Sequence, residues 1–101
     1  MSRGANAAVA VAQATTWTTL FDATTDGGYL TAAGFGGVST NTDRVYIRWT
    51  MSNGNVNYLS IGSTDWKPIK AGLLQIAKIE AQSPSDSQSV YFDACGDNLA
   101  G

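Results

Sequence analysis

The chain has 101 residues and a formal net charge of −2, with 44% hydrophobic and only 14% charged residues. This length suits one domain with one core, and the few scattered basic residues argue against a nucleic-acid-binding surface. The absence of histidine excludes Ser-His-Asp and Cys-His catalytic sets. Because the chain has a single cysteine, it cannot form an intrachain disulfide. No run of the sequence reaches the roughly 18 apolar residues of a membrane-spanning helix.

Residues 1–16 (MSRGANAAVAVAQATT) are rich in alanine and carry one charge, Arg3. Two interpretations stay open for this segment. Ala12-Gln13-Ala14 fits a signal-peptide cleavage site, but the apolar stretch before it is short and interrupted by Asn6. We favour the alternative, an extended Ala-rich N-terminal arm that lies against the domain or a neighbouring subunit, followed by a single β domain at residues 17–101.

Residues 17–24 (WTTLFDAT) alternate aromatic and polar side chains and predict a strand, which Asp26-Gly27-Gly28 ends in a turn. In residues 29–38 (YLTAAGFGGV) we expect at most a short strand at 29–32. The glycines around Phe35 predict a loop after it. They match neither the dinucleotide-binding nor the P-loop motif, so a conformational role is favoured over phosphate binding.

Residues 44–62 (RVYIRWTMSNGNVNYLSIG) carry the clearest pattern in the chain. Val45, Ile47, Trp49 and Met51 share one face of an extended segment, because successive side chains of a strand point to opposite faces. Asn53-Gly54 then predicts a type I′ turn with positive φ at both residues. With a second strand after the turn, the whole stretch predicts a β-hairpin.

Three further strands are expected in the second half of the chain. Residues 66–70 (WKPIK) predict an edge strand, because Pro68 has no N–H to donate to a ladder. A tight turn at Ala71-Gly72 leads into residues 73–81 (LLQIAKIEA). A helix is the alternative there, because some side chains of the segment are spaced three and four residues apart, as on one face of a helix. The segment is short and lacks an N-cap, so we favour a strand. Residues 88–94 (QSVYFDA) alternate as a last strand.

Short strands at intervals of about ten residues, separated by Gly, Asn and Ser turns, predict an all-β fold. We expect an antiparallel β-sandwich or small barrel of the jelly-roll or Greek-key kind, with the N-terminal arm extended beside it. The order of the strands cannot be derived from this pattern.

The acidic residues fit turns better than a catalytic pair. A glycosidase needs two carboxyl groups across a cleft, whereas most carboxylates here stand in turn sequences, where Asp accepts hydrogen bonds from its own backbone: Asp26, Asp43, Asp65, Asp86 and Asp97. Asp93, Asp97 and Asn98 offer oxygen ligands for calcium, but their spacing matches no loop motif.

The tryptophans divide between core and surface. Trp49 is in phase with Val45 and Ile47, which predicts a core position. Trp66 stands beside an edge strand and a turn, where an aromatic ring serves a protein interface or, alternatively, a sugar-stacking platform. Cys95 has no histidine to activate it, so a small buried residue is favoured over a nucleophile.

The order of sequence motifs in residues 58–94 resembles that of small virion structural proteins of tailed bacteriophages, such as head decoration proteins. The resemblance is carried by Trp66-Lys67-Pro68-Ile69-Lys70-Ala71-Gly72, by Leu74-Gln75-Ile76 and Lys78-Ile79, and by the closing Ser89-Val90-Tyr91-Phe92-Asp93-Ala94. This sequence has Leu73 at the position after Ala71-Gly72 where the pattern of those proteins has an acidic residue. The arm and the glycine-rich region lie outside the resemblance.

The resemblance implies a β-sandwich that binds the capsid exterior, often as a trimer, and stabilises the shell. The major capsid protein or other virion proteins would then be its partners, and no enzyme activity, cofactor, nucleic acid or membrane is expected. The residues expected at the assembly interface are Arg3, Val9, Val11, Trp17, Trp66 and Pro68. A tail, connector or head-fibre component is the nearest alternative, and a secreted carbohydrate- or ligand-binding module is the alternative of another class.

Overall fold

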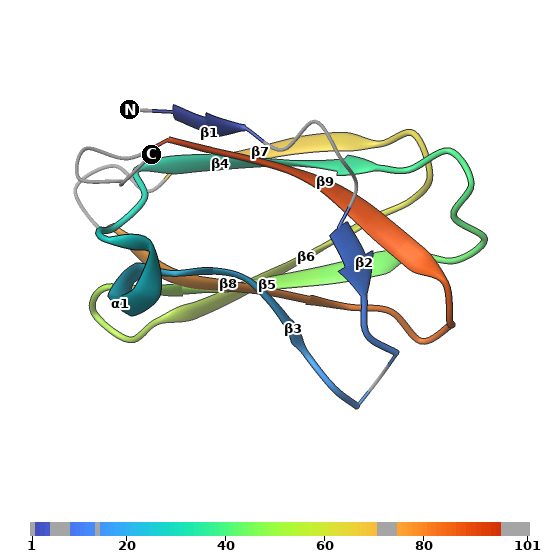
Figure 1. Cartoon of the computed structure of the whole chain (residues 1–101), viewed down its shortest axis with the longest axis horizontal. Coiled ribbons are helices and arrows are strands. Elements are labelled where there is room, and N and C mark those ends of the chain that lie inside the picture. Colours follow the sequence, from blue (N-terminus) through green and yellow to red (C-terminus); the bar gives the residue numbers. More distant parts are fainter. Residues whose placement is uncertain (1, 5–8, 14, 71–74, 96–101) are drawn as a thin grey trace.

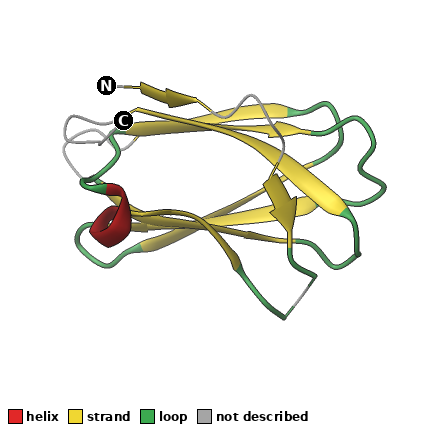
Figure 2. Cartoon of the chain, viewed as in Figure 1, coloured by secondary structure: helices red, strands yellow, loops and turns green. Residues whose placement is uncertain are grey.

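The computed structural model describes residues 2–4, 9–13, 15–70 and 75–95. These residues form two antiparallel sheets that pack face to face, with one short helix at one end of the sandwich (Figures 1 and 2). This confirms the predicted all-β sandwich. In chain order the elements are β1 (Ser2–Gly4), β2 (Val9–Val11), β3 (Thr18–Asp22), α1 (Ala23–Asp26), β4 (Ala32–Gly37), β5 (Val45–Met51), β6 (Val56–Ile61), β7 (Trp66–Lys70), β8 (Ile76–Gln82) and β9 (Gln88–Cys95).

The strands pair as one long hairpin rolled up on itself. β5 pairs with β6, β4 with β7, β3 with β8 and β2 with β9, all antiparallel. Successive pairs alternate between a four-stranded sheet, β3-β8-β5-β6, and a five-stranded sheet, β1-β9-β4-β7, in which β2 also pairs with β9. This nested pairing across two sheets is the arrangement of a jelly roll.

The core lies between the two sheets and consists of inward-facing side chains from both. The rings of Phe35 and Phe92 stack with their centroids 5.7 Å apart. Each large apolar side chain that is fully buried contributes about 1.5–3 kcal/mol through the surface it removes from water. The fully buried apolar residues include Phe21, Leu30, Phe35, Val45, Ile47, Ile61, Ile76, Ile79 and Val90.

The β5–β6 hairpin is confirmed, but its predicted type I′ turn is wrong. Only Gly54 has a positive φ, of 92°. Its N–H donates to the carbonyl of Met51 (2.9 Å), and the N–H of Met51 donates to the carbonyl of Asn55 (2.8 Å). This is a tight turn followed by a left-handed glycine. Asn53 does not need a positive φ here, and its side-chain Oδ1 instead accepts from the N–H of Asn55 (3.1 Å).

The predicted glycine loop around Phe35 is wrong, as is the short strand at 29–32. β4 runs from Ala32 to Gly37 and pairs with β7 on one side and β9 on the other. Phe35 points into the core, while Gly34 and Gly36 lie on the outer face under the indole ring of Trp66. A Cβ on Gly34 would lie 2.7 Å from Cη2 of that ring. These glycines therefore make room for a side chain from a neighbouring strand.

The strand predicted at residues 17–24 ends earlier than expected. β3 stops at Asp22, whose Oδ1 accepts hydrogen bonds from the N–H (3.0 Å) and hydroxyl (2.7 Å) of Thr24. Asp22 is thus the N-cap of α1. The helix ends at Gly27 with a φ of 88°, a conformation that favours glycine.

The remaining strand predictions are confirmed. β7 is an edge strand, β9 is the last strand, and residues 76–82 form strand β8, so the helix alternative there is wrong. The turn at Ala71-Gly72 and residues Leu73 and Leu74 lie outside the described residues.

The two strands of the N-terminal segment, β1 and β2, belong to the five-stranded sheet. The backbone of Arg3 in β1 faces Ala94, and Val9 in β2 faces Val90. Val11 is only 6% exposed and is part of the core. Both short strands therefore lie along the same side of β9, and the domain division at residue 16 stays a prediction.

Candidate functional site

The residues predicted at an assembly interface lie in three places. Arg3 is in β1, and Val9 and Val11 are in β2, where both valines pack on the core. Trp66 and Pro68 lie on edge strand β7 of the five-stranded sheet. Trp17 lies apart from them, against the outer face of the four-stranded sheet. The structure therefore brings together Trp66 with Pro68 and Val9 with Val11, and the interface itself stays a prediction.

The outer face of the four-stranded sheet carries an aromatic surface centred on Arg48. The register places Arg48 between Glu80 on β8 and Tyr58 on β6, and its guanidinium carbon lies 4.2 Å from the centroid of the Trp17 ring. Tyr58 is 66% exposed. We call this surface the Arg48 face; it consists of Trp17, Tyr46, Arg48, Val56 and Tyr58.

Glu80 holds Arg48 in place on that face. Nε of Arg48 donates to Oε1 of Glu80 at 2.8 Å, and Nζ of Lys78 lies 3.8 Å from Oε2 of the same carboxylate. The hydrogen bond to Glu80 raises the pKa of Arg48 above its usual value. Because the carboxylate of Glu80 is largely buried, its hydrogen bond holds the guanidinium over the Trp17 ring, where a cation–π contact forms. The arginine is thus preorganised.

The outer face of the five-stranded sheet carries a second aromatic surface. The indole ring of Trp66 lies over Gly34 and Gly36, and a Cβ on Gly36 would contact both this ring (3.1 Å) and Cβ of Tyr91 (3.3 Å). Trp66 is 57% exposed, and Tyr91 is also exposed. We call Trp66, Pro68 and Tyr91 the Trp66 platform. The predicted surface position of Trp66 is confirmed, and Trp49 packs against the core as expected.

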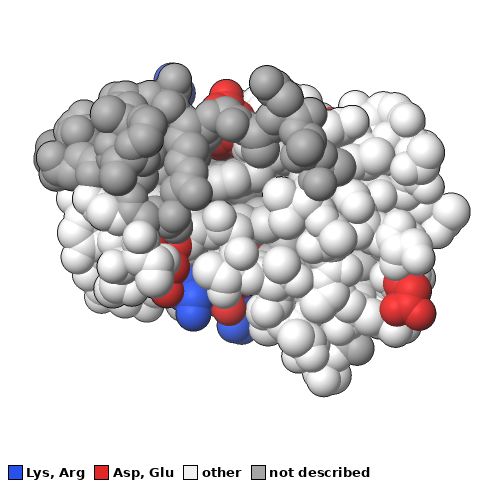
Figure 3. Space-filling view, viewed as in Figure 1, with Lys and Arg blue, Asp and Glu red and all other residues white. Residues whose placement is uncertain are grey.

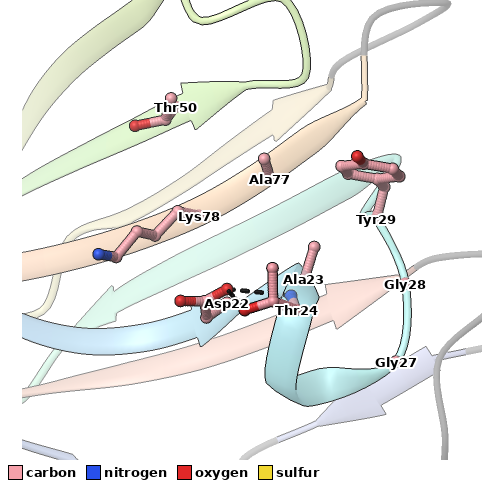
Figure 4. Close-up of a pocket in the computed structure, with 9 residues that line it drawn as sticks. All are labelled: Asp22, Ala23, Thr24, Gly27, Gly28, Tyr29, Thr50, Ala77 and Lys78. Atoms are coloured by element: carbon pink, nitrogen blue, oxygen red, sulfur yellow. Dashed lines mark hydrogen bonds between the residues drawn. The ribbon is translucent and has the colours of Figure 1, made fainter.

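A cavity of about 520 Å³ opens beside α1. Figure 4 shows Lys78 and Ala77 on β8 and Thr50 on β5 along one wall, and the helix with Tyr29 along the other. The carboxylate of Asp22 at its rim caps the helix, and the two hydrogen bonds from Thr24 lower the pKa of Asp22. This carboxylate therefore serves as an N-cap. The lining residues are Asp22, Ala23, Thr24, Gly27, Gly28, Tyr29, Thr50, Ala77 and Lys78.

The turn role predicted for the aspartates is confirmed at two positions. Oδ1 of Asp43 accepts from the N–H of Arg44 (2.7 Å) and Oδ2 from the hydroxyl of Ser85 (2.6 Å), and these bonds lower the pKa of Asp43. Oδ2 of Asp65 accepts from the N–H of Gly62 (2.8 Å). Of the three residues considered as calcium ligands, Asp97 and Asn98 lie outside the described residues. Within the described ranges no cluster of three metal-binding side chains occurs.

The sequence did not reveal the structural role of Gln88. Its side chain is almost fully buried, and its Oε1 accepts from the N–H groups of Thr42 (2.8 Å) and Asp43 (3.0 Å). It therefore fastens the loop before β5 to the start of β9. Neither the spacing nor the chemistry of neighbouring residues marks this glutamine, because its partners lie far away along the chain.

In the described part of the chain, no helix is long and apolar enough to cross a membrane. Comparisons of the sequence with family models and with curated proteins, and of the fold with solved structures, find no match.

Proposed function

We propose that this protein is a non-enzymatic structural component of a tailed-bacteriophage virion, which stabilises the outside of the head through contacts between subunits. The observation that carries the proposal is the Arg48 face. Arginine, tryptophan and tyrosine are the residue types enriched at protein interfaces. Here they lie side by side on an open sheet, with the arginine already oriented by Glu80.

The small number of charged residues supports the same proposal. Only 14% of the residues are charged, and Figure 3 shows a face on which uncharged side chains predominate. Charged residues are depleted at the centre of interfaces, because removing them from water is costly. A surface of this kind suits contact with neighbouring proteins over a wide area. The jelly roll is also used by capsid proteins, although the fold hosts other functions and does not by itself carry the proposal.

The mechanism we propose is stabilisation by mass action. A subunit that binds the assembled shell but not its separated components stabilises the shell by its binding free energy at every occupied site. Arg48 and Trp17 need little reordering on binding, since their positions are fixed before contact. Such preorganisation lowers the entropic cost of association.

Co-sedimentation with phage heads that lack the protein tests this proposal. We expect saturable binding of the full chain and a higher temperature of DNA release from the heads. Tyr58→Ala should weaken binding, whereas Tyr29→Ala, at an exposed tyrosine beside α1 and outside the expected interface, is the matched control. Heads that neither retain the protein nor gain heat resistance would contradict the proposal. Electron microscopy of the particles separates the head from the tail, connector or fibre alternatives.

The Trp66 platform favours a second candidate, a carbohydrate-binding module. One face of the indole lies against the glycines of β4 and the ring remains largely exposed. A flat, exposed aromatic ring with a tyrosine beside it suits stacking against the apolar face of a sugar ring. Titration with soluble oligosaccharides, followed by isothermal titration calorimetry, tests this candidate. Loss of the signal in Trp66→Ala but not in Trp17→Ala would support it.

A further inference from the structure

The four-stranded and five-stranded sheets differ in how their edges are protected against pairing with other chains. Open edges usually carry charges, prolines, bulges or very short strands. β7 contains Pro68 between Lys67 and Lys70, β3 has a register shift between Thr19 and Phe21, and β1 and β2 have three residues each. Each of these edges therefore carries one of the usual obstacles.

β6 is an edge strand whose own sequence contains no such obstacle. It is the last strand of the four-stranded sheet, has six residues, and contains neither a charge nor a proline nor a glycine (VNYLSI). Its first three residues are all exposed. An uncharged, extended edge of this kind is a ready template for one more strand.

The pairing of β5 with β6 determines which backbone groups face outward. The N–H of Met51 donates to the carbonyl of Asn55, and hydrogen-bonded and non-hydrogen-bonded pairs then alternate along an antiparallel ladder. The backbone groups of Asn57 and Leu59 therefore face β5, and those of Val56, Tyr58 and Ser60 face away from it. The carbonyl of Ser60 confirms this direction, because it accepts from Nζ of Lys67 (2.9 Å) and Nη2 of Arg44 (3.2 Å). The open stretch of the edge thus extends from Val56 to Tyr58.

We propose that this stretch pairs antiparallel with the same stretch of a second copy of the chain, about a two-fold axis at Asn57. Val56 then lies opposite Tyr58 of the second copy, and about four backbone hydrogen bonds form. A two-fold contact is self-complementary, and because β6 carries no charge, the two strands meet without repulsion.

Side chains support this register. The pair of Val56 with Tyr58 of the second copy joins a β-branched and an aromatic residue, one of the favourable cross-strand combinations. Arg48 lies beside Tyr58 on the neighbouring strand, so the Arg48 faces of the two copies join into one continuous surface. The short ladder predicts a weak, reversible dimer. This inference does not depend on the virion proposal, and it differs from the trimer that the family resemblance implies.

Sedimentation equilibrium of the full chain, at concentrations up to about 1 mM, tests the proposal. We expect a monomer–dimer equilibrium whose dissociation constant rises about tenfold or more in Tyr58→Pro relative to Tyr58→Ala. Both variants lose the aromatic ring, but only the proline also removes the outward N–H. A monomer at every concentration, or equal dissociation constants for the two variants, would overturn the proposal.

Cysteine cross-linking gives a second test that does not need Tyr58→Pro to fold. In a Cys95→Ser background, Asn57→Cys places two thiols across the axis at a non-hydrogen-bonded pair, with Cα atoms about 4.5 Å apart, within reach of a disulfide. We expect Asn57→Cys to form disulfide dimers faster than Asn53→Cys in the nearby turn. Equal rates, or a faster reaction of Asn53→Cys, would refute the proposed register and the dimer with it.

Discussion

The indole ring of Trp66 lies directly on Gly34, so that a Cβ there would come within 2.7 Å of Cη2 of the ring. This contact joins an edge strand to the middle of its sheet. It also explains why a segment rich in glycine forms a central strand rather than a loop.

We predict that Gly34→Ala displaces the indole ring and lowers the free energy of unfolding by about 1–2 kcal/mol, because no space exists for the added methyl group. Gly36→Ala is the matched control, since its Cβ would lie 3.1 Å from the ring and a small shift relieves it. Denaturant unfolding measures the stability, and acrylamide quenching measures the exposure of Trp66. Equal effects of the two variants would show that the ring does not lie on Gly34.

The hairpin turn provides a prediction about backbone conformation. Gly54 has a φ of 92° with open space around it, so Gly54→Ala should cost about 1 kcal/mol through backbone strain alone. Asn53→Ala should cost less, because Asn53 contributes only an exposed hydrogen bond to Asn55. Thermal unfolding of both variants checks the order. A larger loss in Asn53→Ala would point to the type I′ turn after all.

The contact between Arg48 and Glu80 should be measurable by a double-mutant cycle. The two side chains are 31% and 11% exposed and meet at 2.8 Å, so we expect a coupling energy of about 1–2 kcal/mol for Arg48→Ala and Glu80→Ala. Arg48→Ala should also change the fluorescence of Trp17, since it uncovers the ring. A coupling energy near zero would mean that solvent screens the pair completely.

Acid should weaken the hydrogen bonds that Asp43 accepts in the loop before β5. Because two hydrogen bonds lower the pKa of Asp43 in the folded state, its contribution is present above the ordinary aspartate pKa of about 3.9 and is lost as pH falls through the lower folded value. Asp43→Asn and Ser85→Ala should therefore both reduce the loss of melting temperature between about pH 5 and pH 2. An unchanged pH dependence in both variants would contradict this role of Asp43.

Patterns carried by neighbouring residues were predictable from the sequence, and those that depend on distant partners were not. The β5–β6 hairpin follows from alternation and a turn within one stretch, and the edge position of β7 follows from Pro68 alone. The strand at Gly34 could not be foreseen because its support, Trp66, comes from another strand. The same holds for the Arg48 face, since Trp17, Arg48, Tyr58 and Glu80 meet only after β3, β5, β6 and β8 have paired.

The nested order of the strands has a consequence for the kinetics of folding. β5 and β6 are close in sequence and can pair early, but each pair outside them closes a longer loop, and β2 meets β9 only when nearly the whole chain is available. Proteins dominated by such distant contacts fold slowly. β9 therefore has to leave the ribosome before the outermost layer can form, and until then the incomplete sheets remain exposed to association with other nascent chains.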